Sequence, residues 1–451
     1  MNRRNFLTKT AIGTAAAAVA GPMILNSCSP VKGANERVIF GHIGLGGRGT
    51  GELQDYFLRW PDEIRSTVFC DVFRSRRENA LKMAEKAYQD KKIEAQLQFH
   101  NRFEKVLEHK EIDAVAITTP DHWHLPIAIA AARAGKHIHL AKPLGLSHPD
   151  MVLLEKVCRE NNVLFNYGVQ QRSFLFMQHA VEMIKNGEIG KVERVDVWCP
   201  RINDVPMPSC TEEAVPAGLD YDRYVGPAPF HPYCPARVDM QSSYFIYDYS
   251  LGFIAGWGAH PLDIMVFGIK DQLTGRYTCE GKGGYWAPGT IWDTINSWDT
   301  VYEYENGLKL HFMSDEIAQP IVMKYRPLWD GNGTTFFGTK GWISLGRSSA
   351  SSDIPAIHKE LNKTANPDGW INGEGAQIAK IFTDTIRGKR KELCPLDDAI
   401  LSDTISHIGN IAIRTGRKIT WDPAVGTTVG DPEGMRWFVR EHRSPYDQGL
   451  K

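Results

Sequence analysis

Residues 37–49 read RVIFGHIGLGGRG, an apolar run that leads directly into a glycine-rich turn. The run is typical of a buried strand, and residues 49–58 are predicted to form a helix. In such a strand–turn–helix unit, glycines permit a tight turn and let a pyrophosphate approach the amide groups at the start of the helix. The turn therefore predicts a dinucleotide site formed by Gly44, Leu45, Gly46, Gly47, Arg48 and Gly49.

A second predicted strand, residues 66–71, ends in an acid, Asp71. At this place a carboxylate accepts hydrogen bonds from the adenosine ribose and repels the 2′-phosphate of NADP. Arginines follow at positions 74, 76 and 77, and an arginine here can pair with such a phosphate. We therefore expect NAD as the cofactor and rank NADP below it.

The patterns further along the chain divide it into two domains. Apolar strands at 114–119 and 136–140 alternate with helices, which predicts a doubly wound parallel sheet, a Rossmann domain, over residues 37–165. Alternating segments follow, and Asn306-Gly307 separates two of them, a strong hairpin signal. Residues 166–395 are therefore predicted to be a substrate-binding α/β domain with a large open, mostly antiparallel sheet. Residues 396–451 are predicted to be a helix and tail that pack back on the body.

The first residues have the charged-then-apolar pattern of an export leader. Asn2-Arg3-Arg4-Asn5-Phe6-Leu7 precedes a small, apolar stretch, which indicates a twin-arginine export signal over residues 1–28 and a linker over 29–36. Leu25-Asn26-Ser27-Cys28 resembles a lipobox, so Cys28 is a candidate lipid anchor. We expect an exported protein, either periplasmic or a membrane-anchored lipoprotein.

Composition excludes some classes of partner. Lys and Arg number 52 and Asp and Glu 53, so the chain lacks the positive charge that nucleic acid binding needs. None of the eight cysteines forms a Cys-x-x-Cys pair, and no metal site is expected. Twin-arginine export carries proteins that folded in the reducing cytoplasm, so the cysteines are interpreted as free or buried thiols.

Several motifs, in order and spacing, resemble the Gfo/Idh/MocA family of glucose-fructose and inositol dehydrogenase-like proteins. They are Thr119-Pro120-Asp121-His122-Trp123-His124, Ala134-Gly135-Lys136-His137-Ile138-His139, Lys142-Pro143-Leu144, Gln170-Gln171-Arg172, Gly187 to Val192, Gly226 to Pro229, Gly256 to Asp263 and Gly409 to Arg414. The resemblance covers essentially the whole chain after the leader. It implies a Rossmann domain and a second domain whose open sheet forms the substrate floor and often an oligomer interface, so a homo-oligomer is expected.

The resemblance also implies roles for individual residues. Lys142 meets the substrate hydroxyl beside the nicotinamide, and His260 acts as acid or base from the second domain. The expected cofactor contacts beyond the glycine turn and Asp71 are Thr119, Pro120, His124 and Lys142. The expected substrate contacts are Gln171, Arg172, Asp263 and His260.

Two positions depart from the family pattern. The Glu that usually precedes the lysine is Ala141, and the Asp often found four residues before the histidine is Gly256. Either other groups supply the missing charge, with Asp263, Asp248 and Tyr247 as candidates, or the proton chemistry differs.

Free nicotinamide cofactor is scarce outside the cytoplasm, so an exported member is expected to carry tightly held NAD. The favoured function is an oxidoreductase that oxidises a ring hydroxyl of a sugar or glycoside, at C3, to a keto-sugar. The first alternative is a redox-neutral NAD-dependent glycosidase that works by oxidation, elimination, hydration and reduction. The second is a non-catalytic sugar-binding lipoprotein.

Overall fold

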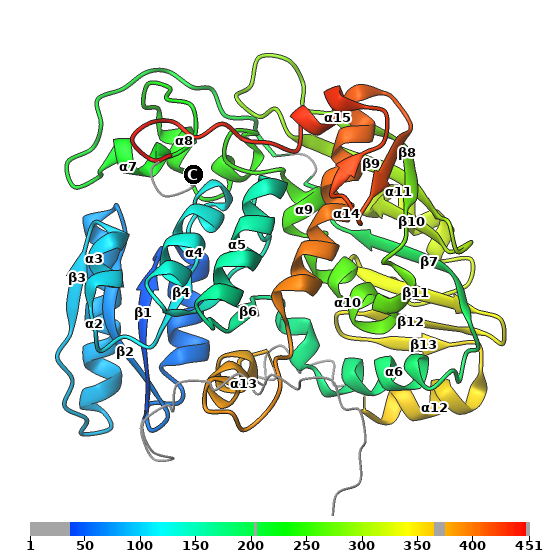
Figure 1. The fold of residues 1–451 in the computed structure, drawn as a ribbon, viewed down its shortest axis with the longest axis horizontal. Coiled ribbons are helices and arrows are strands. Elements are labelled where there is room, and N and C mark those ends of the chain that lie inside the picture. Colours follow the sequence, from blue (N-terminus) through cyan, green and yellow to red (C-terminus); the bar gives the residue numbers. More distant parts are fainter. Residues whose placement is uncertain (1–36, 203–204, 365–374, 448–451) are drawn as a thin grey trace, which may run out of the picture.

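The computed structural model describes residues 37–202, 205–364 and 375–447. The predicted export signal, the linker and Cys28 lie outside these residues. Within them the chain forms a parallel six-stranded sheet and a mixed, mostly antiparallel nine-stranded sheet (Figure 1). The fold class predicted from the sequence is confirmed.

The first sheet has the strand order β3-β2-β1-β4-β5-β6, and every pairing is parallel. The order places β1 and β4 side by side at the centre, where the chain reverses direction across the sheet; ligands bind at such a point in open α/β sheets. The strands are β1 Val38–Ile43, β2 Ile64–Cys70, β3 Gln98–His100, β4 Ala114–Ile117, β5 His137–Leu140 and β6 Phe165–Tyr167.

Helices cover the first sheet and bury its apolar residues in a main core and in a smaller cluster under α2. These are α1 Gly47–Glu52, continued by a π-helical turn Leu53–Phe57, then α2 Arg74–Gln89, α3 Phe103–Glu108, α4 His124–Arg133 and α5 His148–Glu160. A late helix, α13 Gln377–Ile386, returns to this domain. Its Lys380 bonds to Glu63 at 3.1 Å, and Phe382 packs on Phe40.

The second sheet has the order β13-β12-β11-β7-β10-β9-β8-β14-β15. Only the pairing of β7 with β10 is parallel. The predicted hairpin is confirmed, because β9 and β10 are antiparallel and joined at Gly307, whose φ is +87°. The strands are β7 Val192–Cys199, β8 Tyr277–Tyr285, β9 Ile295–Tyr304, β10 Lys309–Ser314, β11 Gly333–Gly338, β12 Trp342–Gly346, β13 Ala350–Ser352, β14 Ile419–Asp422 and β15 Thr427–Thr428.

The helices of the second domain pack mainly on one face of this sheet. They are α6 Leu175–Lys185, α9 Phe253–Gly256, α10 Ala259–Ile269, α11 Asp315–Val322, α12 Pro355–Thr364, α14 Leu396–Thr415 and α15 Pro432–Arg436. The long α14 runs between the two domains (Figure 1), and its Asp403 accepts hydrogen bonds from Tyr167 of β6 and from the amide of Leu144. The predicted C-terminal helix thus joins both halves of the molecule.

Residues 205–250 form a cover above the first domain, and it contains α7 Tyr221–Val225 and α8 Pro235–Val238 (Figure 1). A disulfide between Cys210 and Cys234 closes a loop within the cover. The expectation that all the cysteines are thiols is therefore wrong for Cys210 and Cys234. The fold of the loop brings these two residues together although they are 24 positions apart in the sequence. Among the described residues, the other cysteines are free and buried, at 70, 158, 199, 279 and 394. No described helix is both long and apolar enough to span a membrane.

Candidate active site

The glycine turn fits closely against its neighbours. Gly44 has φ +88°, and a Cβ there would lie 2.6 Å from the backbone of Thr118. A Cβ at Gly49 would overlap the carbonyl oxygen of Gly44. Only a glycine at position 49 therefore lets the start of α1 approach the end of β1 this closely. The close packing brings the backbone of the turn against β1 and β4, and the amides of Gly44, Leu45 and Gly47 donate to Cys70, Asp71 and Met240.

Asp71 lies at the end of β2 and supports the turn. Its carboxylate accepts hydrogen bonds from the amides of Leu45 at 2.7 Å and Phe73 at 2.8 Å. Burial raises the pKa of Asp71, whereas the charge of Arg76, 3.9 Å away, acts to lower it. Arg76 also stacks on Phe73, its guanidinium carbon 3.9 Å from the ring centre. An acid and a cation thus lie side by side at the adenosine end of the site.

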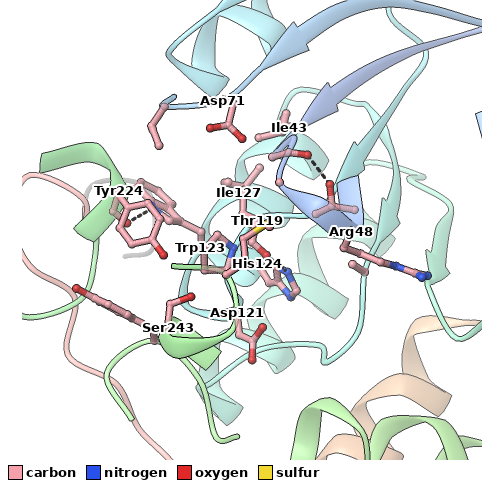
Figure 2. A pocket seen from close by; sticks show the side chains of 18 of the residues that line it. Ile43, Arg48, Asp71, Thr119, Asp121, Trp123, His124, Ile127, Tyr224 and Ser243 are labelled. Atoms are coloured by element: carbon pink, nitrogen blue, oxygen red, sulfur yellow. Dashed lines mark hydrogen bonds between the residues drawn. The ribbon is translucent and has the colours of Figure 1, made fainter. Parts of the chain in front are cut away.

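A cavity of about 370 Å³ extends from this turn along the carboxyl ends of β1, β2 and β4. Its first-domain wall includes Gly44, Gly46, Gly47, Arg48, Asp71, Thr119, Pro120, His124 and Lys142. Leu45 and Gly49 shape the turn without lining the cavity. The cover forms the opposite wall, and Figure 2 shows Tyr224 and Ser243 of the cover across the cavity from Ile127. The amide of Gly47 donates to Sδ of Met240 in the cover at 2.8 Å.

The motif from Asp121 to His124 fastens the cover to the first domain. Asp121 accepts a hydrogen bond from the hydroxyl of Ser250 at 2.6 Å, and Trp123 donates from its indole to the carbonyl of Arg223 at 2.9 Å. His122 is buried 3.0 Å from the carbonyl of Tyr224, and burial lowers its pKa to about 4. The motif therefore has a role in closing the cavity that its sequence alone does not indicate.

His124 links two segments of the cavity wall. Its Nδ1 lies 2.7 Å from the carbonyl oxygen of Pro143, and its Nε2 lies 2.8 Å from that of Thr119. From the other side, Asp403 of α14 accepts the amide proton of Leu144 at 2.6 Å. Both contacts hold the segment that carries Lys142, so His124 and Asp403 position the lysine.

Lys142 projects into the inner end of the cavity. Its Nζ donates to the carbonyl of Gly256 at 2.5 Å and to the hydroxyl of Tyr244 at 3.3 Å. Burial, with a contribution from Arg48, lowers the pKa of Lys142 to about 8, although Asp121 acts in the opposite direction. The amine can therefore exchange a proton near neutral pH.

Tyr244 occupies the space left by the glycine at position 256. A Cβ at Gly256 would overlap the Tyr244 hydroxyl, so a side chain there would point at the atom that contacts Lys142. Burial and Asp121 raise the pKa of Tyr244 well above its usual range, which keeps the phenol protonated. The partner of Lys142 is thus a tyrosine of the cover, which the sequence reading missed.

The candidates proposed to replace the missing carboxylates make other contacts. Asp263 pairs with Arg172, and Asp248 pairs with His231 at 3.0 Å. Tyr247 lies between two guanidiniums, those of Arg414 at 3.7 Å and Arg440 at 3.9 Å from the ring centre. The sequence reading is corrected here, because packing against these partners holds all three side chains away from Lys142.

His260 is the second residue of α10, and the charge of Lys142 acts on it. The residue is buried, and burial together with Arg347, Lys142 and Arg48 holds its pKa well below the usual range. Its Nδ1 is buried without a hydrogen-bond partner among the described residues. A neutral imidazole in this position can accept or donate one hydrogen bond to a ligand.

The other side chains that were expected to contact substrate form hydrogen bonds and ion pairs within the protein. Arg172 donates to both carboxylate oxygens of Asp263 at 2.6 Å and to Asp398 at 2.6 Å, entirely within the interior. Gln171 is buried and donates to Asn332 at 3.2 Å. The substrate roles expected for Arg172, Asp263 and Gln171 are corrected to architectural ones, because a buried guanidinium needs its paired acids.

Both halves of the chain match profiles of one family. Residues 39–169 match the "Oxidoreductase family, NAD-binding Rossmann fold", and residues 201–448 match its "C-terminal alpha/beta domain". The chain belongs to the Gfo/Idh/MocA oxidoreductase family. The second match alone covers more than half of the sequence, and the Rossmann domain binds NAD in this family.

Curated relatives match over part of the chain. A 2,7-anhydro-N-acetylneuraminate hydratase of Escherichia coli is 37% identical over 83 residues, 18% of this chain and 22% of its own length. A glycosyl hydrolase family 109 protein of Saccharopolyspora erythraea is 30% identical over 166 residues, 35% of this chain and 34% of its own. The chain thus spans about a third or less of the length of these two relatives.

Solved structures share the fold over most of the chain. The WlbA dehydrogenase from Bordetella pertussis, in complex with NADH and UDP-GlcNAcA, has a TM-score of 0.63 at 16% identity and covers 86% of this chain and 98% of its own. A scyllo-inositol dehydrogenase from Lactobacillus casei, with bound NAD(H) and scyllo-inositol, has a TM-score of 0.57 at 14% identity and covers 86% and 100%.

Proposed function

We propose that this protein is an NAD-dependent oxidoreductase that oxidises a ring hydroxyl of a sugar or glycoside, at C3, to a keto-sugar. The observation that carries the proposal is Lys142, held between the Gly256 carbonyl and Tyr244 at the inner end of the dinucleotide cavity. Sugar-processing relatives and neighbours support the substrate class.

The residues of the cavity fit a nicotinamide dinucleotide. The close packing at Gly44 and Gly49 would let a pyrophosphate approach the backbone at the start of α1, and Asp71 lies where the ribose hydroxyls would reach it. Asp71 favours NAD, whereas Arg76, in the same wall, is the residue that would accept a 2′-phosphate. We propose NAD as the cofactor, because the carboxylate of Asp71 is hydrogen-bonded to the glycine turn.

Bound NAD would supply a hydride acceptor for the carbinol carbon, so that loss of the hydroxyl proton would leave a ketone. Lys142 takes that proton at Nζ, because its lowered pKa leaves part of the amine neutral near pH 8. Tyr244 donates a hydrogen bond to the substrate oxygen, which stays on the carbon as the ketone oxygen, or relays the hydroxyl proton to Nζ by taking it up as it gives its own. His260 orients the same hydroxyl from the second domain.

We also propose that the protein is exported and keeps its NAD through many turnovers. The leader supports export, and so does the Cys210–Cys234 disulfide, which is typical of an oxidising compartment. The cover supports retention, because Ser250, Tyr224 and Arg223 bond to the motif at Asp121 to Trp123 across the cavity. Lipid attachment at Cys28 and self-association through the open sheet belong to the same proposal.

The second candidate is the redox-neutral glycosidase. It is favoured by the two glycosyl hydrolase family 109 relatives, of which that of Stenotrophomonas maltophilia aligns over 43% of this chain at 28% identity. In this reaction transient oxidation acidifies the neighbouring C–H, the glycosidic group is eliminated, water adds and the hydride returns. The cleft is the same, and only the products differ.

The test begins with protein purified without added cofactor and then denatured to release bound NAD. Intact protein is next incubated with a panel of glycosides: a keto-sugar supports oxidation, and a reducing sugar with unchanged NAD supports the glycosidase. Binding without either product indicates a sugar-binding protein. The family assignment predicts bound or bindable NAD, and a protein that binds none contradicts the proposal.

Lys142→Ala should lower turnover by about 100-fold or more while leaving NAD binding intact. In the unchanged protein, the oxidation rate should rise as pH passes through about 8, because the amine must be neutral to accept a proton. Reduction of the ketone should show the opposite trend. Rapid oxidation by the alanine variant would show that another group accepts the proton.

A further inference from the structure

One acidic side chain in the wall of the cofactor cavity, that of Asp121, has no cationic partner. Asp121 begins the 3-10 turn Asp121–Trp123 that follows β4, and it is only 4% exposed. Its carboxylate accepts a hydrogen bond from the neutral hydroxyl of Ser250 at 2.6 Å, and among the described residues it forms no ion pair. A carboxylate without a cation is costly in the interior of a protein, so this position suits a ligand that brings a positive charge.

The other acid of the cavity wall and the arginines of the wall are paired within the protein. They form the ion pairs Arg48–Glu52, Arg223–Glu104 and Arg76–Asp71. The two remaining bases of the wall contact uncharged groups: His124 lies between two carbonyl oxygens, and Lys142 donates to a carbonyl and a phenol. Among the described residues of the wall, Asp121 is therefore the one acid whose charge no ion pair offsets.

Asp121 lies at the end of the cavity that the nicotinamide would occupy. Figure 2 shows Asp121 and Asp71 at opposite ends of the cavity, with Thr119 and His124 between them. Asp71 marks the adenosine end, so a dinucleotide that follows the glycine turn would extend its nicotinamide toward Asp121. Lys142 lines the same cavity, and its charge and that of Asp121 act on each other.

The two redox forms of the cofactor differ in charge at this end. The nicotinamide ring is a cation in NAD⁺, the oxidised form, and is neutral in NADH, the reduced form. Burial raises the pKa of Asp121, whereas His124, Ser250 and Lys142 act to lower it, and a cationic ring beside the carboxylate would act in the same direction as these three. Because the cavity is enclosed by the cover, this attraction is weakened less by solvent than it would be at the surface.

We propose that Asp121 makes the cavity select NAD⁺ over NADH, because its carboxylate is the counter-charge of the nicotinamide cation. This inference rests on the proposed function, since it concerns the cofactor of the same cavity. Nζ of Lys142 gains the hydroxyl proton in the proposed oxidation, in which the hydride neutralises the ring. One cation therefore lies near Asp121 both before and after the reaction, and the carboxylate is not left without a counter-charge.

The experiment measures which redox form the protein retains when no sugar is present. Purified protein is equilibrated with an excess of NAD⁺ and NADH in equal amounts, free nucleotide is removed by gel filtration, and the bound forms are released by denaturation and separated by chromatography. The pH is set about one unit above the pKa of Lys142, which is about 8, so that the amine is neutral with either form bound.

Two variants remove the carboxylate. Asp121→Asn keeps the shape of the side chain and an acceptor for the Ser250 hydroxyl, and Asp121→Ser is smaller. The matched control is Asp150→Asn, because Asp150 of α5 is also a buried acid with a hydrogen bond to one side chain, that of His442 at 2.7 Å, but does not line the cofactor cavity. Thermal denaturation shows which variants are folded, and either folded variant of Asp121 decides the outcome.

We expect the wild type to retain NAD⁺ over NADH by about 10- to 100-fold. Asp121→Asn and Asp121→Ser should lower this ratio by about 10-fold or more, and Asp150→Asn should preserve it. No excess of NAD⁺ on the wild type, or an excess that persists in a folded variant of Asp121, overturns the inference. Loss of the excess in Asp150→Asn as well overturns it too, because the effect would then not belong to the acid in the cavity wall.

Incubation of the same protein with the glycoside panel separates this inference from the proposed function. A keto-sugar formed by protein that shows no preference for NAD⁺ overturns the role of Asp121 alone. Selection of NAD⁺ that depends on Asp121, without any keto-sugar, supports the inference and contradicts the oxidation. Folded protein that retains neither form of the nucleotide overturns both.

Discussion

At the scale of single residues, the chemistry depends on how Tyr244 and Gly256 share one small volume. The glycine leaves room for the phenol, the phenol contacts Nζ of Lys142, and the glycine's own carbonyl accepts from the same nitrogen. A neutral tyrosine in place of a carboxylate leaves Lys142 with less opposing negative charge. This agrees with a lysine pKa near 8 rather than its ordinary value.

Tyr244→Phe removes the hydroxyl and keeps the ring. We expect kcat to fall about 100-fold, because Lys142 loses the group that shares its proton, while the affinity for NAD stays the same. Stopped-flow absorbance of the bound cofactor measures the change, and fluorescence titration measures the NAD affinity.

A reciprocal exchange tests the same pair more sharply. Gly256→Asp alone should lose activity, because its Cβ overlaps Tyr244, whereas Gly256→Asp with Tyr244→Ala should regain part of it. Full activity of Tyr244→Phe, or no gain in the double variant, would show that the phenol has no part in proton transfer.

Lys142 and the glycine turn could be predicted because both belong to short motifs of contiguous residues. Tyr244 could not, because it lies 102 residues from Lys142 in a short 3-10 turn, Ser242–Phe245, whose sequence has no readable pattern. Arg172 and Asp263 were expected at the substrate because the family resemblance implied it. Only coordinates show that they neutralise each other in the interior.

At the scale of elements, regular patterns predicted the central strands β1, β2, β4 and β5 of the first sheet and the β9–β10 hairpin, and the strands that were not predicted have physical causes. β8, read as YTCEGKGGY, has three glycines and little apolar alternation, so it is a strand chiefly because it pairs with β9 along its whole length. β3 and β14 are short, and their sequences are too brief for a period to be visible. Long-range pairing, rather than local propensity, defines these strands.

The cover is the element on which cofactor retention depends. Cys210→Ser with Cys234→Ser should leave the catalytic residues in place but speed the release of NAD, because the 24-residue loop loses a constraint of about 3 kcal/mol. Gel filtration followed by assay of the remaining NAD measures the loss.

Cys158→Ala is the matched control, since this free, buried thiol of α5 does not belong to the cover. An unchanged rate of NAD release in the double serine variant, with the wild type shown to contain the disulfide, would mean that the bonds from the cover to residues 121–123 suffice for retention.

At the scale of the whole molecule, one buried ion network connects the two domains. Arg172 follows the last strand of the first sheet and pairs with Asp263 of α10 and Asp398 of α14. The same α14 reaches the catalytic segment through Asp403 and Leu144. The relative position of Lys142 and His260, which come from different domains, therefore depends on this network.

Arg172→Met should lower the free energy of unfolding by about 3 to 5 kcal/mol, because it leaves Asp263 buried without its cation and leaves Asp398 with Lys270 alone. Thermal denaturation measures this loss, and the matched control is Arg194→Met, whose partly exposed ion pair with Asp196 should contribute less than about 1 kcal/mol.

Arg172→Met with Asp263→Leu and Asp398→Leu should recover much of the stability, since no charge is then stranded in the interior. Turnover should stay reduced in that triple variant if the network also sets the distance between Lys142 and His260. If the triple variant recovers both its stability and the turnover of the wild type, the ion network contributes to folding alone.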